Sequence, residues 1–182
     1  MTRTSLTLLA VLAAATPAVA SPTELDVQVD PTPFFLAGFA PEVGVTLAGH
    51  RAYATVVGYD VPRFLREDPR FAERRNAIVS VGYEYFVRGA LAGPFLGING
   101  AVTNATFSLA DGGSRDETVN TFRVATRLGW VIYPIAALPG LFLGPWLSVG
   151  YSVAPRAFAI DGQMIERKAI GFTGAAQLGW RF

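Results

Sequence analysis

The last residues of the chain constrain its fold most strongly, because residues 170–182 alternate strictly between two kinds of side chain. The apolar or small set comprises Ile170, Phe172, Gly174, Ala176, Leu178, Trp180 and Phe182. Successive residues of a β-strand point to opposite faces, so a period of two is typical of a strand. Residues 170–182 therefore predict a strand with one apolar face and one face that is polar or small.

The same alternation recurs along the chain, in segments that are separated by turn-forming residues. These segments are residues 40–48, 52–60, 76–87, 93–107, 120–133 and 141–153. Each is about nine to fifteen residues long, which suits a tilted strand that crosses a bilayer. Because a closed single-chain barrel normally has an even number of strands, we expect a further strand within residues 24–39. Pro31 and Pro33 restrict that strand to an edge or a bent segment.

Two long stretches, residues 89–110 and 128–155, contain no charged residue. Either is long enough to cross a membrane as a helix, so a helical inner-membrane protein is an alternative interpretation. Closely spaced breakers such as Pro134, Pro139 and Pro145 oppose a continuous helix. Both stretches are therefore interpreted as strand, turn and strand.

Residues 1–20 have the pattern of a secretory signal peptide. Arg3 precedes a short apolar run, and Ala18 and Ala20 supply the small residues of a cleavage site. We expect cleavage after Ala20 and one domain over residues 21–182. That domain has fourteen basic and fourteen acidic residues, which does not indicate the basic face of a nucleic-acid-binding protein. The chain has no cysteine, so neither a disulfide nor a lipid-modified cysteine is expected.

The connections between the expected strands alternate in character. Short ones are residues 49–51, 88–92 and 134–140, and longer polar ones are residues 61–75, 108–119 and 154–169. Short turns at one end and long loops at the other are typical of outer-membrane barrels. Together with the signal peptide, the alternating segments and the terminal residues Leu178, Trp180 and Phe182, they make the chain resemble the small outer-membrane β-barrel proteins of Gram-negative bacteria.

This resemblance implies a closed, antiparallel, up-and-down transmembrane barrel of eight strands in the bacterial outer membrane. It implies contacts with outer-membrane lipid and lipopolysaccharide, and it makes Leu178, Trp180 and Phe182 the signal that the barrel-assembly machinery reads. The short turns would then be periplasmic and the long loops extracellular. A soluble periplasmic sandwich or barrel is the alternative, and it would keep its apolar side chains inside.

In a membrane barrel the polar face of each strand points into the lumen. The charged residues on that face are Glu42, Glu84, Arg123, Arg127 and Arg181. An eight-stranded barrel is narrow enough to be filled by side chains, and unpaired buried charges are costly. We therefore predict an ionic plug centred on Glu84 with Arg123 or Arg127, and no open pore. A narrow channel lined by the same arginines is the alternative.

An enzyme that modifies lipopolysaccharide or lipid is a further alternative, and it would need a nucleophile beside a base. The chain has one histidine, His50, in a turn expected to be periplasmic, whereas Ser108 and Ser114 lie at the other end. We therefore expect no catalytic activity, and a structural or interaction role through the extracellular loops. No cofactor, metal or nucleic acid is expected, and no feature indicates an oligomeric state.

The loop from residue 61 to residue 75 combines several arginines with acidic residues. A solvated mixed-charge loop is the simpler interpretation. Guanidinium groups also suit phosphates by their geometry, so Arg66, Arg70 and Arg74 are predicted to contact lipopolysaccharide phosphates.

Overall fold

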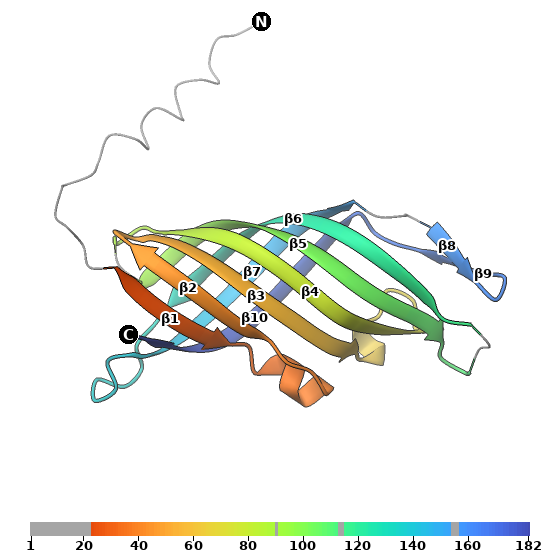
Figure 1. The fold of residues 1–182 in the computed structure, drawn as a ribbon, viewed down its shortest axis with the longest axis horizontal. Helices are drawn as coiled ribbons and strands as arrows, with labels where there is room; N and C mark the ends of the chain where they lie inside the picture. Colours follow the sequence, from red (N-terminus) through yellow and green to blue (C-terminus); the bar gives the residue numbers. More distant parts are fainter. Residues whose placement is uncertain (1–22, 90, 113–114, 154–156) are drawn as a thin grey trace, which may run out of the picture.

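The computed structural model describes residues 23–89, 91–112, 115–153 and 157–182, so the expected signal peptide lies outside the described residues. Eight strands form a closed antiparallel barrel, and the predicted fold class is confirmed (Figure 1). They are β1 (Glu24–Val29), β2 (Pro41–Leu47), β3 (His50–Val61), β4 (Phe71–Phe86), β5 (Gly93–Leu109), β6 (Glu117–Val131), β7 (Leu141–Val153) and β10 (Ile170–Arg181). Two short strands, β8 (Ala157–Ile160) and β9 (Gln163–Glu166), form a separate hairpin, and two 3-10 helices are η1 (Thr32–Leu36) and η2 (Arg63–Leu65).

The connections segregate to the two ends of the barrel. At one end, the turn end, the last residue lies beside the connections 48–49, 87–92 and 132–140 (Figure 1). At the other, the loop end, are the connections 30–40, 62–70, 110–116 and 154–169, the last of which carries the β8–β9 hairpin. Among the described residues, no helix has the length and apolar character to cross a membrane. The two charge-free stretches instead supply β5, the end of β6 and β7.

The strand expected within residues 24–39 is β1, which closes the ring. It pairs with β10 as far as Val29 and Leu178, and with β2 as far as Val29 and Pro41. Pro31 directly precedes η1, and proline has no amide hydrogen to continue a ladder. This explains why β1 is only six residues long.

Strands β4, β5 and β6 reach further toward the loop end than the alternation predicted. The expected loop 61–75 shrinks to residues 62–70, because β4 already begins at Phe71. A register shift between Arg75 and Ala77 interrupts the alternation. Such a bulge inserts one extra residue, so Phe71 and Glu73 are buried although they are out of step with the rest of the strand.

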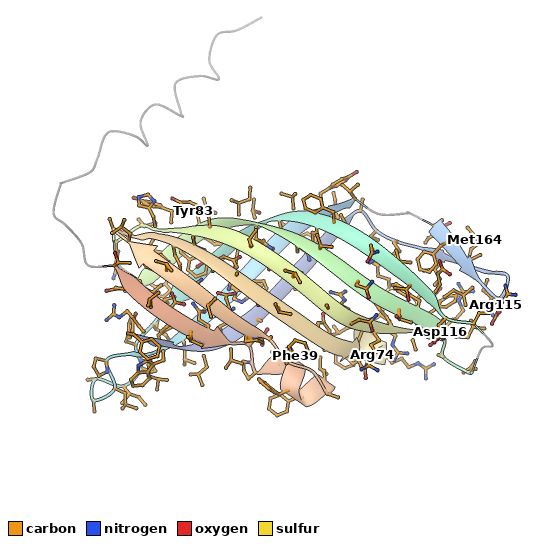
Figure 2. All side chains as sticks on the ribbon, in the orientation of Figure 1. Phe39, Arg74, Tyr83, Arg115, Asp116 and Met164 are labelled. Atoms are coloured by element: carbon orange, nitrogen blue, oxygen red, sulfur yellow. The ribbon has the colours of Figure 1, made fainter. Side chains whose placement is uncertain are left out.

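The outer wall of the barrel is apolar, and its interior carries the polar side chains. Exposed residues include Leu25, Val27, Val43, Val45, Val79, Val81, Leu96, Ile98, Val102, Phe122, Val124, Leu128, Leu147, Val149 and Phe172. Buried polar residues include Asp26, Gln28, Glu42, Thr46, Arg51, Ser80, Glu84, Thr121, Arg127 and Gln177. This arrangement is the inverse of a soluble protein and is typical of barrels that face lipid. Aromatic residues, among them Tyr83 (Figure 2), are exposed near the turn end.

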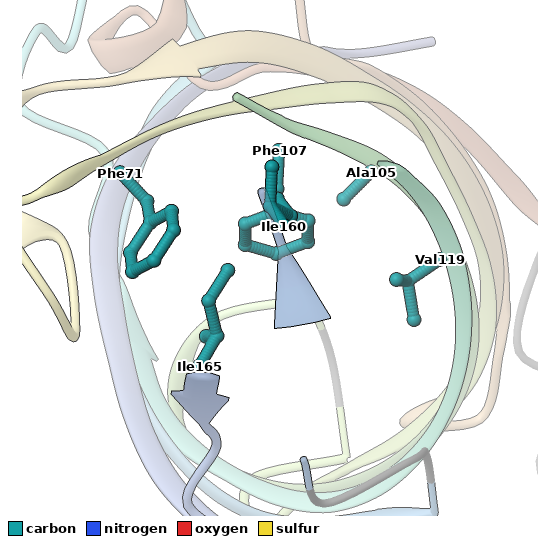
Figure 3. Packing of buried hydrophobic residues seen from close by; sticks show 6 residues of the cluster. All are labelled: Phe71, Ala105, Phe107, Val119, Ile160 and Ile165. Carbon is teal, nitrogen blue, oxygen red and sulfur yellow. The ribbon is translucent and has the colours of Figure 1, made fainter. Parts of the chain in front are cut away.

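Apolar clusters fill the barrel at both ends. Near the turn end, a cluster that we call the floor consists of Phe86, Leu91, Phe95, Val131 and Phe142. Near the loop end, the roof consists of Phe71, Ala105, Phe107, Val119, Ile160 and Ile165 (Figure 3). The β8–β9 hairpin contributes the last two, so it folds over the mouth with its isoleucines inside the ring of strands.

Candidate functional site: a charged ring in the lumen

A fully buried arginine from β3 lies at the centre of the charged lumen. The Arg51 guanidinium donates two hydrogen bonds to Asp26 of β1, Nε to Oδ2 at 2.9 Å and Nη2 to Oδ1 at 2.6 Å. Its Nη1 lies 2.9 Å from a carboxylate oxygen of Glu42 and 2.9 Å from one of Glu84. One guanidinium therefore joins three carboxylates from three different strands.

A second arginine completes the arrangement from the opposite wall. Arg127 of β6 places Nη1 3.0 Å from Glu84 and 3.6 Å from Glu42. Its Nη2 donates to Gln177, whose amide nitrogen donates in turn to Glu42 at 3.0 Å. Positive and negative side chains thus alternate around a closed ring of Arg51, Glu84, Arg127 and Glu42. Together with Asp26 and Gln177, we call this cluster the charged ring.

Aromatic and small neighbours give the charged ring its room and its walls. The Arg127 guanidinium lies over the Trp146 ring, 4.4 Å from its centre, and over Tyr53 at 5.2 Å. A Cβ at Gly44 would overlap the Arg51 guanidinium, and one at Gly97 would meet Glu84 Cγ at 2.9 Å. Both glycines are therefore required for these side chains to lie across the lumen.

The structure brings together only part of the predicted lumen set. Glu42, Glu84 and Arg127 meet in the charged ring. Arg181 lies apart and places Nη1 3.4 Å from Glu24 at the turn end. Arg123 is also separate: it donates to Thr173 Oγ1 at 2.7 Å and to the Gly171 carbonyl at 3.0 Å.

Sequence reasoning missed Asp26 and Arg51, the most buried members of the charged ring. Arg51 was assigned to the turn, which in fact consists of Ala48 and Gly49, both with positive φ (51° and 82°). Two residues with positive φ are what the tightest hairpin turn requires, and the pairing of Leu47 with His50 follows directly. Had the two-residue turn been recognised, alternation would have placed Arg51 inside.

The predicted phosphate-binding arginines differ in their surroundings. Arg66 donates to the backbone carbonyls of Val61 and Phe71, at 2.9 Å and 3.3 Å, and so holds the loop together. Arg70 is exposed and pairs with Asp68 at 2.5 Å, and this guanidinium lowers the pKa of the Asp68 carboxyl. Arg74 is exposed at the loop end, 3.6 Å from Asp60 (Figure 2).

The remaining predicted residues lie on the outer wall near the turn end. His50 begins β3, and its Nδ1 hydrogen-bonds the Tyr83 hydroxyl at 2.5 Å. Leu178, Trp180 and Phe182 are all exposed. No group of three or more histidine and acidic side chains among the described residues is arranged to hold a metal ion.

Comparison with known proteins adds one structural likeness. Neither a protein-family model nor a curated protein matches the chain. The fold is similar to the crystal structure of Neisserial surface protein A (NspA), with a TM-score of 0.44 and 16% identity, over 87% of this chain and 94% of that one. A likeness of this degree carries no functional information, and the barrel is established by the strand pairing of this chain itself.

Proposed function

We propose that this protein is a plugged outer-membrane β-barrel, a structural or interaction protein of the bacterial envelope that acts through its loop end. The observation that carries this proposal is the filled lumen. The interior contains three layers along the barrel axis: the apolar floor, the charged ring and the apolar roof. Eight strands enclose a space that side chains can fill, so we expect no continuous aqueous path through the interior.

The proposed location rests on the outer wall. Below a polar row at the loop end, its side chains are mostly apolar, and an aromatic set lies near the turn end, as in barrels with interfacial girdles. The turn end is then periplasmic and the loop end extracellular. Leu178, Trp180 and Phe182 point outward on the closing strand, where they are accessible to the assembly machinery.

A non-enzymatic role is supported by the separation of the reactive groups. A general base must contact its nucleophile. His50 is at the turn end and contacts Tyr83, whereas Ser108 lies at the other end of the barrel, near the end of β5.

Arg70 and Arg74 are the proposed contacts to lipopolysaccharide phosphates, because both guanidiniums are exposed. Arg74 is flanked on the outer wall by hydrogen-bonding side chains, since Asn76 donates to Asn104 at 2.9 Å and to Thr106 at 2.8 Å. Such a polar row suits the sugar and phosphate layer above the acyl chains. Arg66 is already engaged with backbone carbonyls.

Three measurements test the proposal. The protein should be recovered in the outer-membrane fraction with heat-modifiable gel migration, and it should show no steady conductance in planar bilayers. A soluble periplasmic protein, or a steady open-pore current, would overturn the proposal. Lipopolysaccharide co-purifying with the protein should fall in Arg70→Gln/Arg74→Gln, whereas Arg88→Gln, which replaces an exposed arginine at the turn end, is the matched control and should retain it.

A further inference from the structure

One edge of the closing strand lacks a strand partner in the described residues. β10 pairs with β7 along its whole length, from Ile170 to Trp180. On its other side it pairs with β1 only from Leu178 to Arg181, because β1 ends at Val29. The connection that follows turns toward β3 instead, where Phe39 bridges Gly58. The half of β10 nearer the loop end therefore borders a break in the barrel wall.

The backbone groups along this break can be identified from the ladder. Ser152 N donates to the Ala169 carbonyl, and Phe182 N donates to the Leu25 carbonyl. Hydrogen-bonding directions alternate along an antiparallel strand, so odd-numbered residues bond β7 and even-numbered ones face β1. The amides and carbonyls of Ile170, Phe172, Gly174 and Ala176 therefore point into the break, and we call them the β10 edge.

The β10 edge lies within the apolar part of the wall. Phe172 is 84% exposed and Ile170 is 59% exposed. Their partners across the ladder, Val149 and Tyr151, are also on the outer surface. Unpaired backbone groups cost several kcal/mol each in hydrocarbon, so a membrane location requires a polar group at this edge, and an acyl chain alone does not supply one.

The lumen side of the break is basic. Arg123 donates to Thr173 Oγ1 and to the Gly171 carbonyl, both on β10, and its Nε is buried without a hydrogen-bond acceptor. No carboxylate among the described residues pairs with it. By contrast, the neighbouring Arg75 lies 3.1 Å from Glu73. A cation without a paired carboxylate among the described residues therefore lies on the lumen side of the stretch of β10 that has no strand partner.

Open space adjoins this cation. Gly171 faces the lumen, between the outward residues Ile170 and Phe172, and no described atom lies within 4 Å of the position that a Cβ would take there. We propose that the β10 edge is the entrance of a binding site for an anionic amphiphile. Its carboxylate or phosphate head lies beside Arg123 and Gly171, and its acyl chain runs out past Phe172 into the lipid.

The positive charge of Arg123 favours an anionic amphiphile over other occupants of this site. A neutral or cationic amphiphile would leave Arg123 without an anion, and a second copy of the chain would satisfy the edge without reaching the lumen. The site is independent of the loop-end contacts proposed above and requires only that the barrel is inserted in a bilayer. Failure of insertion would therefore be recognised separately, from gel migration, before binding is measured.

The test uses the folded protein in phosphatidylcholine nanodiscs and a long-chain fatty acid that carries a photoreactive diazirine. Cross-links should map to residues 170–176 by mass spectrometry and should be displaced by dodecanoate or dodecyl phosphate. Dodecyltrimethylammonium and inorganic phosphate should not displace them. Arg123→Gln should weaken displacement about tenfold or more, since a hydrogen bond to a charged group is lost, and Arg123→Lys should retain most of it.

Two glycine variants distinguish a blocked binding site from a misfolded barrel. Gly171→Val should fill the space and weaken binding at least as much as Arg123→Gln. Gly100→Val is the matched control, because a Cβ at Gly100 meets only the Phe122 ring, at 3.9 Å. Equal displacement by the cationic amphiphile, or cross-links spread over all strands, would overturn the proposal. Efficient disulfide formation between two Phe172→Cys chains in membranes would also overturn it, because a second copy would then cover the edge.

Discussion

Replacing Arg51 with methionine tests whether the charged ring holds the barrel together. The side chain is completely buried and contacts three carboxylates. Methionine keeps much of its length but removes every donor. Among the described residues, the Gln28 amide, at 3.0 Å, would then be the remaining side-chain hydrogen-bond donor to Asp26. Glu42 and Glu84 would share Arg127 as their remaining cation.

The expected loss follows from the burial of these charges. Removing one partner of a buried ion pair costs about 3–5 kcal/mol, because it leaves an uncompensated charge. Arg51→Met should therefore lower the free energy of unfolding by about 3–5 kcal/mol. Adding Asp26→Asn removes one of the orphaned charges, so the double variant should regain about 0.5–3 kcal/mol, the range of coupling energies between contacting residues.

Urea unfolding in lipid vesicles, followed by tryptophan fluorescence and gel mobility, measures these differences. Arg74→Met is the matched control, because its side chain is 73% exposed and lies 3.6 Å from Asp60. Exposed pairs contribute about 1 kcal/mol or less. The reasoning is refuted if Arg51→Met lowers the free energy of unfolding no more than Arg74→Met does. It is also refuted if the losses caused by Arg51→Met and Asp26→Asn simply add in the double variant.

Four other predictions follow from individual contacts. Gly150→Ala should destabilise the barrel by about 1–3 kcal/mol in urea, because the added Cβ would lie 2.7 Å from the Ala125 Cβ and 2.9 Å from the Val124 carbonyl oxygen. Ile165→Ala should loosen the roof, so limited proteolysis should cut the β8–β9 hairpin faster while gel mobility stays unchanged. Burial raises the pKa of Tyr133 from 10 to about 12, so the unfolded chain ionises first and stability should fall as pH rises through this window, less steeply in Tyr133→Phe. Deleting Phe182 should reduce outer-membrane insertion in cells but leave export unchanged.

Each of these has a contrary outcome. Gly171→Ala places its Cβ in open space and should leave the free energy of unfolding unchanged. A loss of stability equal to that of Gly150→Ala would contradict the steric explanation at Gly150. Unchanged cleavage of Ile165→Ala would show that the roof does not hold the hairpin. Identical alkaline slopes in both proteins would exclude Tyr133 as the titrating group, and normal insertion without Phe182 would remove it from the assembly signal.

Alternation predicted the strands well because each strand has two chemically different faces. β7 was predicted as residues 141–153 and has those bounds, and β10 begins at Ile170 as expected. The method failed where the period breaks. The bulge after Arg75 breaks the alternation, so residues 71–75 at the start of β4 were not predicted as strand. The β8–β9 hairpin was predicted as a polar loop because turn residues separate its two isoleucines.

Alternation also identifies the face of a residue but not its height in the barrel. Arg123 and Arg127 share the inner face of β6, yet four residues of strand separate them by about 13 Å. Only Arg127 is level with Glu84, so only Arg127 joins the charged ring. Which of the two pairs depends on the register between strands that are far apart in the sequence, and a single sequence does not contain that register.

The order of layers in the lumen connects the plug with the proposed binding site. The roof closes the barrel toward the loop end, and the charged ring and floor close it toward the turn end. Arg123 lies between these layers, where the surrounding inward residues such as Ser152 and Thr173 are small and only half-buried. With both axial routes closed, as the proposed plug requires, a molecule that reaches Arg123 enters sideways, past the β10 edge. Loosening the roof with Ile165→Ala should therefore leave the tenfold effect of Arg123→Gln intact, whereas an axial route would make amphiphile binding faster in that variant.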